Sequence, residues 1–191
     1  MSKKIKQIIS NSIAVKQALL ADETLIATLC DVVEAGLQTY RQNGKILFCG
    51  NGGSAADAQH IAAELSGRFY KDRPPLFAEA LHVNSSYLTA VGNDYGYDEV
   101  YARMVTAAGR EGDVLFAIST SGNSKNIVKA VEAAMAIGMK VVAMTGESGG
   151  QLKEMADFLL NVPSDDTPRI QESHILLGHI FCELIELKFF N

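Results

Sequence analysis

Two residues in one helical pattern have side chains that could bind a metal ion or transfer a proton. His60 and Glu64 are four residues apart, so a helix would place them on the same face, one turn from each other. Such a pair is often only an exposed helical ion pair. Here the neighbouring residues 61–63 and Leu65 are apolar, and a carboxylate in a half-buried position needs a partner or a function.

The C-terminal helical pattern carries a second polar group, formed by Gln171, Glu172, His174 and His179 among apolar neighbours. Histidine and glutamate from one helix, with histidine and Gln or Glu from another, would provide nitrogen and oxygen ligands suited to zinc. Spacing does not choose the last ligand: on a helical wheel Glu172 lies within about 20° of His179, and Gln171 about 80° away. A subunit interface could also accommodate these polar side chains.

Two segments rich in glycine and serine follow apolar runs and could bind a phosphate. Residues 45–49 lead into Gly-Asn-Gly-Gly-Ser at 50–54, and residues 113–118 lead into Ser-Thr-Ser-Gly-Asn-Ser at 119–124. If a helix starts at each segment, its N-terminus offers unpaired N–H groups and a partial positive charge. Neither segment fits the patterns for nucleoside triphosphates or dinucleotides, which favours a sugar phosphate. The alternative is that the serines only cap a helix.

The elements that must position these residues alternate between strand and helix. Helices separating the strands indicate an α/β fold with a doubly wound parallel sheet, in which ligands bind beyond the carboxyl ends of the strands. Strands are expected at 45–49, 77–83, 113–118, 140–144 and 158–162, and helices at 54–67, 86–91, 98–108, 124–137, 149–156 and 168–189.

Two amphipathic helices are expected before the first strand, at 5–20 and 25–40, and would form an N-terminal helical hairpin. We expect one domain over residues 1–191, with 1–43 as a helical extension used in oligomerisation. A net charge of -5 without a basic stripe argues against nucleic-acid binding. The sequence has no signal-peptide pattern and no apolar run of about 18 residues, so we expect a cytoplasmic protein that is not in a membrane.

Four separated motifs together resemble those of the bacterial phosphoheptose isomerases, a family of the sugar isomerase (SIS) domain group. They are CGNGGSAADAQH at 49–60, GNDYG at 92–96, ISTSGNS at 118–124 and RIQE at 169–172. The resemblance covers essentially the whole chain. It implies a three-layer, flavodoxin-like SIS domain and a homotetramer with sites at subunit interfaces. It also implies the conversion of D-sedoheptulose 7-phosphate to D-glycero-D-manno-heptose 7-phosphate, the first step of activated-heptose biosynthesis for lipopolysaccharide or related glycans.

The resemblance also implies a role for individual residues, each of which has the residue type of the family motif. Glu64 and His179 would be the acid/base pair, and one zinc ion per subunit would be bound by His60, Glu64, Gln171 and His179. This choice favours Gln171 over Glu172, against the helical wheel. The substrate-binding residues would be Asn51, Gly52, Gly53, Glu64, Asn93, Asp94, Ser119, Thr120, Ser121, Ser124 and Gln171.

Two other functions compete with this interpretation. A non-catalytic SIS-domain relative binds the bacterial replication initiator protein and lacks a carboxylate at the position of Glu64, which this chain has. Isomerases of other sugar phosphates share the serine-rich loop, but they differ around the helix that carries His60 and Glu64. Both comparisons favour the heptose isomerase.

Overall fold

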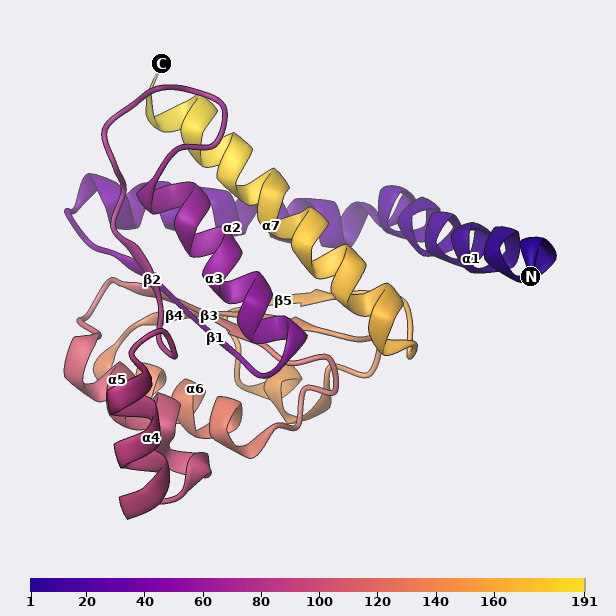
Figure 1. Ribbon diagram of the computed structural model, residues 1–191. Helices are drawn as coiled ribbons and strands as arrows, with labels where there is room; N and C mark the ends of the chain where they lie inside the picture. The colour runs from indigo at the N-terminus through magenta and orange to yellow at the C-terminus, as the bar shows by residue number, and fades with distance from the viewer. Residues whose placement is uncertain (191) are drawn as a thin grey trace.

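A five-stranded parallel sheet in the order β2-β1-β3-β4-β5 lies at the centre of the computed structural model, which describes residues 1–190 (Figure 1). This order is that of flavodoxin-like folds, so the predicted fold class is confirmed. The strands are β1 (Ile46–Gly50), β2 (Ala78–Ala80), β3 (Val114–Ile118), β4 (Lys140–Thr145) and β5 (Phe158–Asn161).

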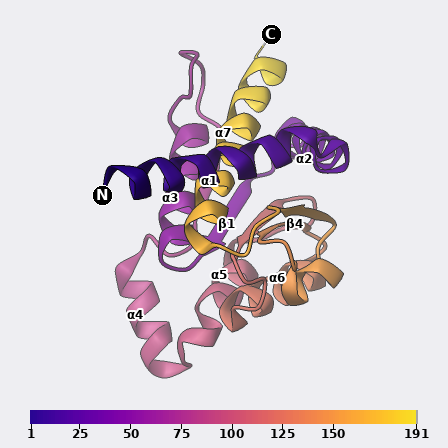
Figure 2. The same cartoon turned by 90° about the vertical axis from the view of Figure 1, so that its right-hand side faces the viewer.

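Helices cover both faces of the sheet (Figures 1 and 2). The α-helices are α1 (Ser2–Ala21), α2 (Glu23–Arg41), α3 (Gly53–Ser66), α4 (Ser85–Asp94), α5 (Val100–Ala108), α6 (Lys125–Ile137) and α7 (Thr167–Phe189), and the short 3₁₀ helices are η1 (Tyr97–Glu99) and η2 (Gly150–Glu154). In Figure 1, α2, α3 and α7 lie above the sheet, and α4, α5 and α6 lie below it.

Alternate residues of each central strand enter two separate hydrophobic cores. In β1, Ile46 and Phe48 join the core beneath α2, α3 and α7, whereas Leu47 and Cys49 join the core that includes α5 and α6. All five residues of β1 are buried, as are all five of β3. A strand covered on both faces has no polar side, which explains the continuous apolar runs in the sequence.

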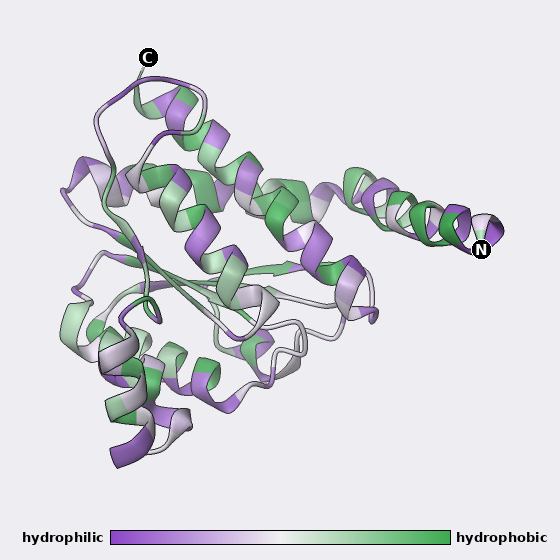
Figure 3. Ribbon diagram, viewed as in Figure 1, coloured by the Kyte–Doolittle hydropathy of each residue, from purple (hydrophilic) through white to green (hydrophobic). Residues whose placement is uncertain are grey.

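Both predicted N-terminal helices are present, and only Asp22 separates them. Helix α2 packs against α7 and β5, whereas α1 projects beyond the body of the protein (Figures 1 and 2). Figure 3 shows hydrophobic residues along this projecting helix. Three of them, Ile5, Ile9 and Ile13, are each at least 50% exposed. Within residues 1–190, no helix is both long and apolar enough to span a membrane.

Two predicted elements differ from the structure. The strand expected at 77–83 has only three residues, because β2 is an edge strand that pairs on one side alone, with Ile46 to Phe48 of β1. The helix expected at 149–156 is the 3₁₀ helix η2. Gly149 and Gly150 both have positive φ values (73° and 54°), which right-handed helix geometry does not allow, so a regular α-helix cannot begin there.

Candidate active site and metal centre

Helices α3 and α7 pack against each other and bring together three possible ligands from distant parts of the chain. His60 and Glu64 lie on α3, and His179 lies on α7. One potential ligand atom from each residue lies within 4.8 Å of the other two. The His60 Nε2 and Glu64 Oε1 atoms are 3.1 Å apart. The predicted one-turn spacing on α3 therefore places the imidazole and the carboxylate next to each other, with His179 facing them.

The environment of His179 fits the binding of a metal ion or a substrate group. Its Nε2 atom is buried and has no hydrogen-bond partner among the described residues. The His60 ring lies 5.0 Å from the His179 ring, and the Phe69 ring 5.7 Å from it, between centroids. An unpaired buried nitrogen is costly, so a ligand for it is expected. Two imidazoles and a carboxylate are the donors that zinc accepts in catalytic sites.

The two residues that helix geometry could not separate lie in different environments. Glu172 accepts a hydrogen bond from Ser12 of α1 (2.7 Å) and forms an ion pair with Arg169 (2.7 Å). Gln171 faces α3 instead, so closely that a Cβ atom on Gly53 would lie 2.5 Å from its Nε2 atom. Gln171 thus lies at the first residue of α3, about two turns before His60, whereas the carboxylate of Glu172 is engaged at α1.

The first glycine-rich segment connects β1 to the start of α3. Gly52 caps α3 with a φ of 55°, a backbone conformation that other residues rarely adopt. The amides of Asn51 and Asn126 exchange two hydrogen bonds, each 2.9 Å long, and Tyr97 donates a third to Asn51 Oδ1 (3.3 Å). This bonding fixes the loop at the carboxyl end of β1, beside the loop that follows β3.

The second segment, between β3 and α6, has a tightly constrained backbone. A Cβ atom on Gly122 would lie 2.1 Å from the carbonyl oxygen of Gly149, so only glycine fits. Ser119 donates a hydrogen bond to Ser124 (3.1 Å), which is the N-cap residue of α6 but makes no side-chain cap bond. Thr120 and Ser121 line a cavity of about 320 Å³. Glu147 and Asp165 also line this cavity, whereas Ser119 and Ser124 do not. The feature of this segment that suits a phosphate is the N-terminus of α6, which follows Ser124.

Asn93 and Asp94 are predicted substrate-binding residues that lie outside the two loops and outside α3 and α7. They end α4, which lies below the sheet in Figure 1, on the face opposite α3 and α7. Both are exposed, and Asn93 Nδ2 donates to Asp94 Oδ1 (2.9 Å).

Two polar residues near the site were not singled out in the sequence. One is Asn126, the buried partner of Asn51, whose contact spans 75 positions of the chain and so leaves no local signal. The other is Asp57, one turn before His60 on α3. Its Oδ2 atom is buried without a hydrogen-bond partner in the described part of the chain. Burial raises the pKa of Asp57 to about 6, although nearby His60 acts to lower it.

Comparison with known proteins identifies the family. A family model described as SIS domain matches residues 11–146. The chain is 55% identical over 185 residues to a phosphoheptose isomerase of Mycobacterium tuberculosis. The aligned residues cover 97% of this chain and 94% of the relative. The chain belongs to the phosphoheptose isomerase family of SIS-domain proteins. This family is one of sugar-phosphate isomerases, so the predicted resemblance and enzyme class are confirmed.

Other phosphoheptose isomerases show the same similarity over almost the full chain. That of Aneurinibacillus thermoaerophilus is 50% identical over 191 residues, covering 100% of this chain and 96% of the relative. The solved structure of a phosphoheptose isomerase from Neisseria gonorrhoeae has a TM-score of 0.91 and 48% identity, covering 97% of this chain and 98% of that one. The N-terminal helices and the sheet therefore belong to the fold shared by this family.

Proposed function

We propose that the protein converts D-sedoheptulose 7-phosphate to D-glycero-D-manno-heptose 7-phosphate. The relatives named above as phosphoheptose isomerases support this substrate class. The observation that carries the proposal is the side-chain cluster of Glu64, His60 and His179. The chain also has two polar loops, after β1 and β3, suited to holding a phosphorylated sugar. Such an enzyme would supply activated heptose for lipopolysaccharide or related glycans, and it would work in the cytoplasm.

Glu64 and His179 would carry out the proton transfers. An aldose–ketose isomerisation breaks a C–H bond beside the carbonyl, forms an enediolate, and returns a proton to the neighbouring carbon. The Glu64 carboxylate would remove and return the carbon-bound proton. His179, across the site on α7, would transfer the proton between the substrate oxygens, since imidazole exchanges protons near neutral pH. Each well-placed group of this kind typically contributes about 10²- to 10⁴-fold in rate.

His60, Glu64, Gln171 and His179 would hold one zinc ion per subunit. The nitrogen and oxygen donors and the unpaired Nε2 atom of His179 support this assignment. When bound, zinc would polarise the carbonyl oxygen of the sugar.

The two loops would hold the rest of the substrate. Ser119, Thr120, Ser121 and Ser124 would bind the phosphate at the N-terminus of α6. Anchoring the phosphate turns binding energy from a remote group into orientation of the reacting carbons. Sugar hydroxyls would be bound by Asn51, Gly52, Gly53, Asn93, Asp94 and Gln171. The carboxylate of Asp94 and the carboxamides of Asn51, Asn93 and Gln171 supply the hydrogen-bonding groups that sugars need.

The protein would assemble as a homotetramer through its N-terminal helices, with active sites at the subunit interfaces. Exposed Ile5, Ile9 and Ile13 form a stripe on α1 that water would otherwise contact. Leu29 of α2 and Leu176 of α7 help to line an apolar groove of about 430 Å³ beside it. Exposed apolar surface of this kind marks association sites, and another copy of the chain is the occupant we propose.

The test is turnover of sedoheptulose 7-phosphate, followed by NMR, with Glu64→Gln and Glu172→Gln measured alongside the wild type. Glu64→Gln removes the proposed base and should lower kcat by about 10²- to 10⁴-fold. Glu172→Gln is the matched control, because this carboxylate is engaged by Ser12 and Arg169 and should be dispensable for chemistry. No conversion by the wild type, with or without added zinc, would contradict the proposed reaction. Full activity of Glu64→Gln would remove Glu64 from it.

A further inference from the structure

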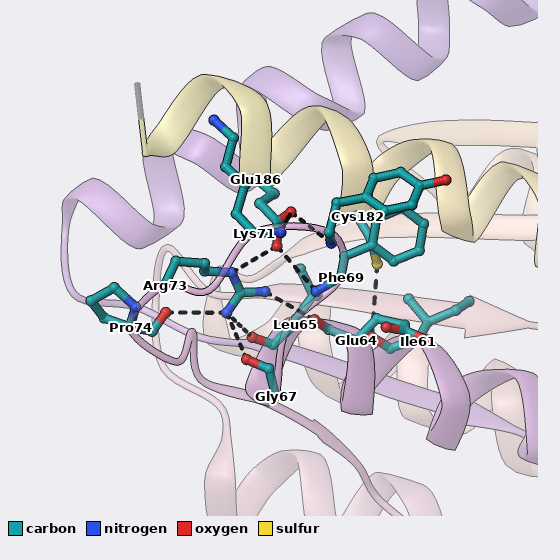
Figure 4. Close-up of polar contacts among 11 residues, drawn as sticks. Ile61, Glu64, Leu65, Gly67, Phe69, Lys71, Arg73, Pro74, Cys182 and Glu186 are labelled. Carbon is teal, nitrogen blue, oxygen red and sulfur yellow. Dashed lines mark hydrogen bonds and ion pairs between the residues drawn. The ribbon is translucent and has the colours of Figure 1, made fainter.

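A buried ion pair lies beyond the proposed acid/base residues, at the far ends of the same two helices. Arg73 follows α3 and Glu186 lies near the end of α7, and their side chains are only 3% and 2% exposed. The Arg73 Nε and Glu186 Oε2 atoms are 3.1 Å apart. Figure 4 shows the pair between the segment after α3 and the last turns of α7.

The Glu186 carboxylate holds the backbone of the segment that follows α3. Its Oε1 atom accepts hydrogen bonds from the amides of Tyr70 (2.8 Å) and Lys71, and its Oε2 atom accepts one from the amide of Phe69 (3.1 Å). Burial acts to raise the pKa of Glu186, but the hydrogen bonds from these amides and from Arg73 outweigh it and lower the pKa. A single ionised side chain of α7 therefore fixes three consecutive residues of this segment.

The Arg73 guanidinium caps the C-terminus of α3, as the dashed lines in Figure 4 show. Its Nη2 atom donates to the carbonyl oxygen of Glu64 (2.9 Å), and its Nη1 atom donates to those of Leu65 (2.7 Å) and Gly67 (3.1 Å). The last carbonyls of a helix have no partner within the helix, and a cation there is favoured by the helix dipole. One of the capped carbonyls belongs to the proposed base itself.

The same pair is connected to His179. Glu186 lies two helical turns after His179 on α7, on nearly the same face. The Glu186 carboxylate accepts a hydrogen bond from the amide of Phe69, whose ring lies 5.7 Å from the His179 ring between centroids. Cys182, between these two residues of α7, donates a long hydrogen bond from its Sγ atom to the carbonyl of Ile61 on α3 (3.8 Å). The contacts of Arg73 and Glu186 thus reach the backbone of the base and the ring that faces the histidine.

We propose that Arg73 and Glu186 are positioning residues that fix Glu64 and His179 relative to each other. This inference rests on the proposed function, because it assigns to the pair the geometry on which that reaction depends. Net stability is a weak reason for burying an ion pair, since removing two charges from water largely offsets their attraction. A fork of directed hydrogen bonds does specify where the two helices and the intervening segment lie.

The test compares Glu186→Gln and Arg73→Lys with Asp113→Asn, a matched control in the segment between α5 and β3. Asp113 is also a buried carboxylate (2% exposed) that pairs with a cation, Lys45 (2.6 Å), and it accepts hydrogen bonds from two backbone amides. Glutamine at 186 has one acceptor oxygen in place of two, and lysine at 73 keeps the charge without the fork. Each protein is measured for melting temperature, kcat, KM and zinc affinity, the last by chelator competition.

All three variants should melt below the wild type, but only the two at the proposed pair should disturb the site. Replacing groups that orient metal ligands typically costs about 10- to 100-fold in metal affinity or activity, so we expect that loss in zinc affinity and kcat, with KM within about three-fold. Asp113→Asn should keep wild-type kcat and zinc affinity. If Glu186→Gln fails to fold, the milder variant Arg73→Lys tests the positioning role in its place.

Wild-type kcat and zinc affinity in a folded variant of the pair would overturn the positioning role, as would equal losses in Asp113→Asn. That result is distinguishable from failure of the proposed function, which would show as no conversion of sedoheptulose 7-phosphate by the wild type.

Discussion

The contact between α3 and α7 is close at Gly178, and enlarging this residue tests whether the site depends on close packing there. A Cβ atom on Gly178 would lie 2.4 Å from Ile61 Cδ1 and 2.7 Å from Ile61 Cγ1. Ile61 is fully buried, so it has little room to move. His179 follows Gly178 directly, and His60 precedes Ile61. In Gly178→Ala, either the Ile61 side chain must change its conformation within the packed core, or the two helices that carry the proposed ligands must separate.

The expected cost follows from two opposing effects. Adding a methyl group to a packed core typically costs about 1–3 kcal/mol, whereas alanine favours a helix over glycine by about 1 kcal/mol. Gly178→Ala should therefore lower the free energy of unfolding by about 0–2 kcal/mol. Ile61→Val removes the closest atom, Cδ1, and alone costs about 0.5–1.5 kcal/mol. In the double variant the clash is partly relieved, so its loss should be smaller than the sum of the single losses by about 0.5 kcal/mol or more.

Urea unfolding of the four proteins at one fixed protomer concentration measures this coupling. Zinc affinity is measured on the same samples, and it should fall in Gly178→Ala and partly recover in the double variant. The close contact between Gly178 and Ile61 would be refuted if the losses in free energy of unfolding of the two single variants add up, within about 0.3 kcal/mol, to the loss of the double variant. A Gly178→Ala protein more stable than the wild type would also refute it.

Two further predictions concern stability and assembly. Burial lowers the pKa of His174 from 6.5 to about 4, although its bond to the Thr145 carbonyl acts to raise it. As pH falls below 6.5 the unfolded chain gains this proton first, so the free energy of unfolding should drop by about 3 kcal/mol between pH 6.5 and 4. Urea unfolding should show this component in the wild type and not in His174→Gln, and equal pH slopes would contradict it. Ile9→Lys should dissociate the oligomer in sedimentation experiments by placing a charge in the apolar stripe of α1, and an unchanged mass would exclude the stripe from the interface.

The central strands could be predicted from the sequence because each is buried on both faces. β3 was expected at 113–118 and spans Val114–Ile118, since no polar residue interrupts its apolar run. The edge strand β2 is shorter than the predicted strand at 77–83. The apolar pattern of these residues does not indicate that pairing with β1 ends at Ala80. Tertiary pairing, rather than local propensity, sets that boundary.

The site was predictable where its residues share a helix and less so where they do not. The four-residue spacing of His60 and Glu64 gives their observed contact directly. The helical wheel places Glu172 nearer than Gln171 to the face of His179, but it cannot show that α1 packs beside α7 and that Ser12 binds the Glu172 carboxylate. The pairing of Arg73 with Glu186 spans 113 positions and depends on the path of the segment after α3, so no local pattern reports it.

The most direct measurement of the central claim is the reaction of sedoheptulose 7-phosphate run in D₂O. If Glu64 removes a proton from the carbon beside the ketose carbonyl and exchanges it with solvent, deuterium is returned to the neighbouring carbon. NMR should then show deuterium in the aldose product on the carbon that carried the carbonyl in the substrate. The wild type should incorporate deuterium, Glu172→Gln should do the same, and Glu64→Gln should incorporate almost none. Deuterium incorporation by Glu64→Gln at the wild-type rate would contradict the assignment of Glu64 as the base.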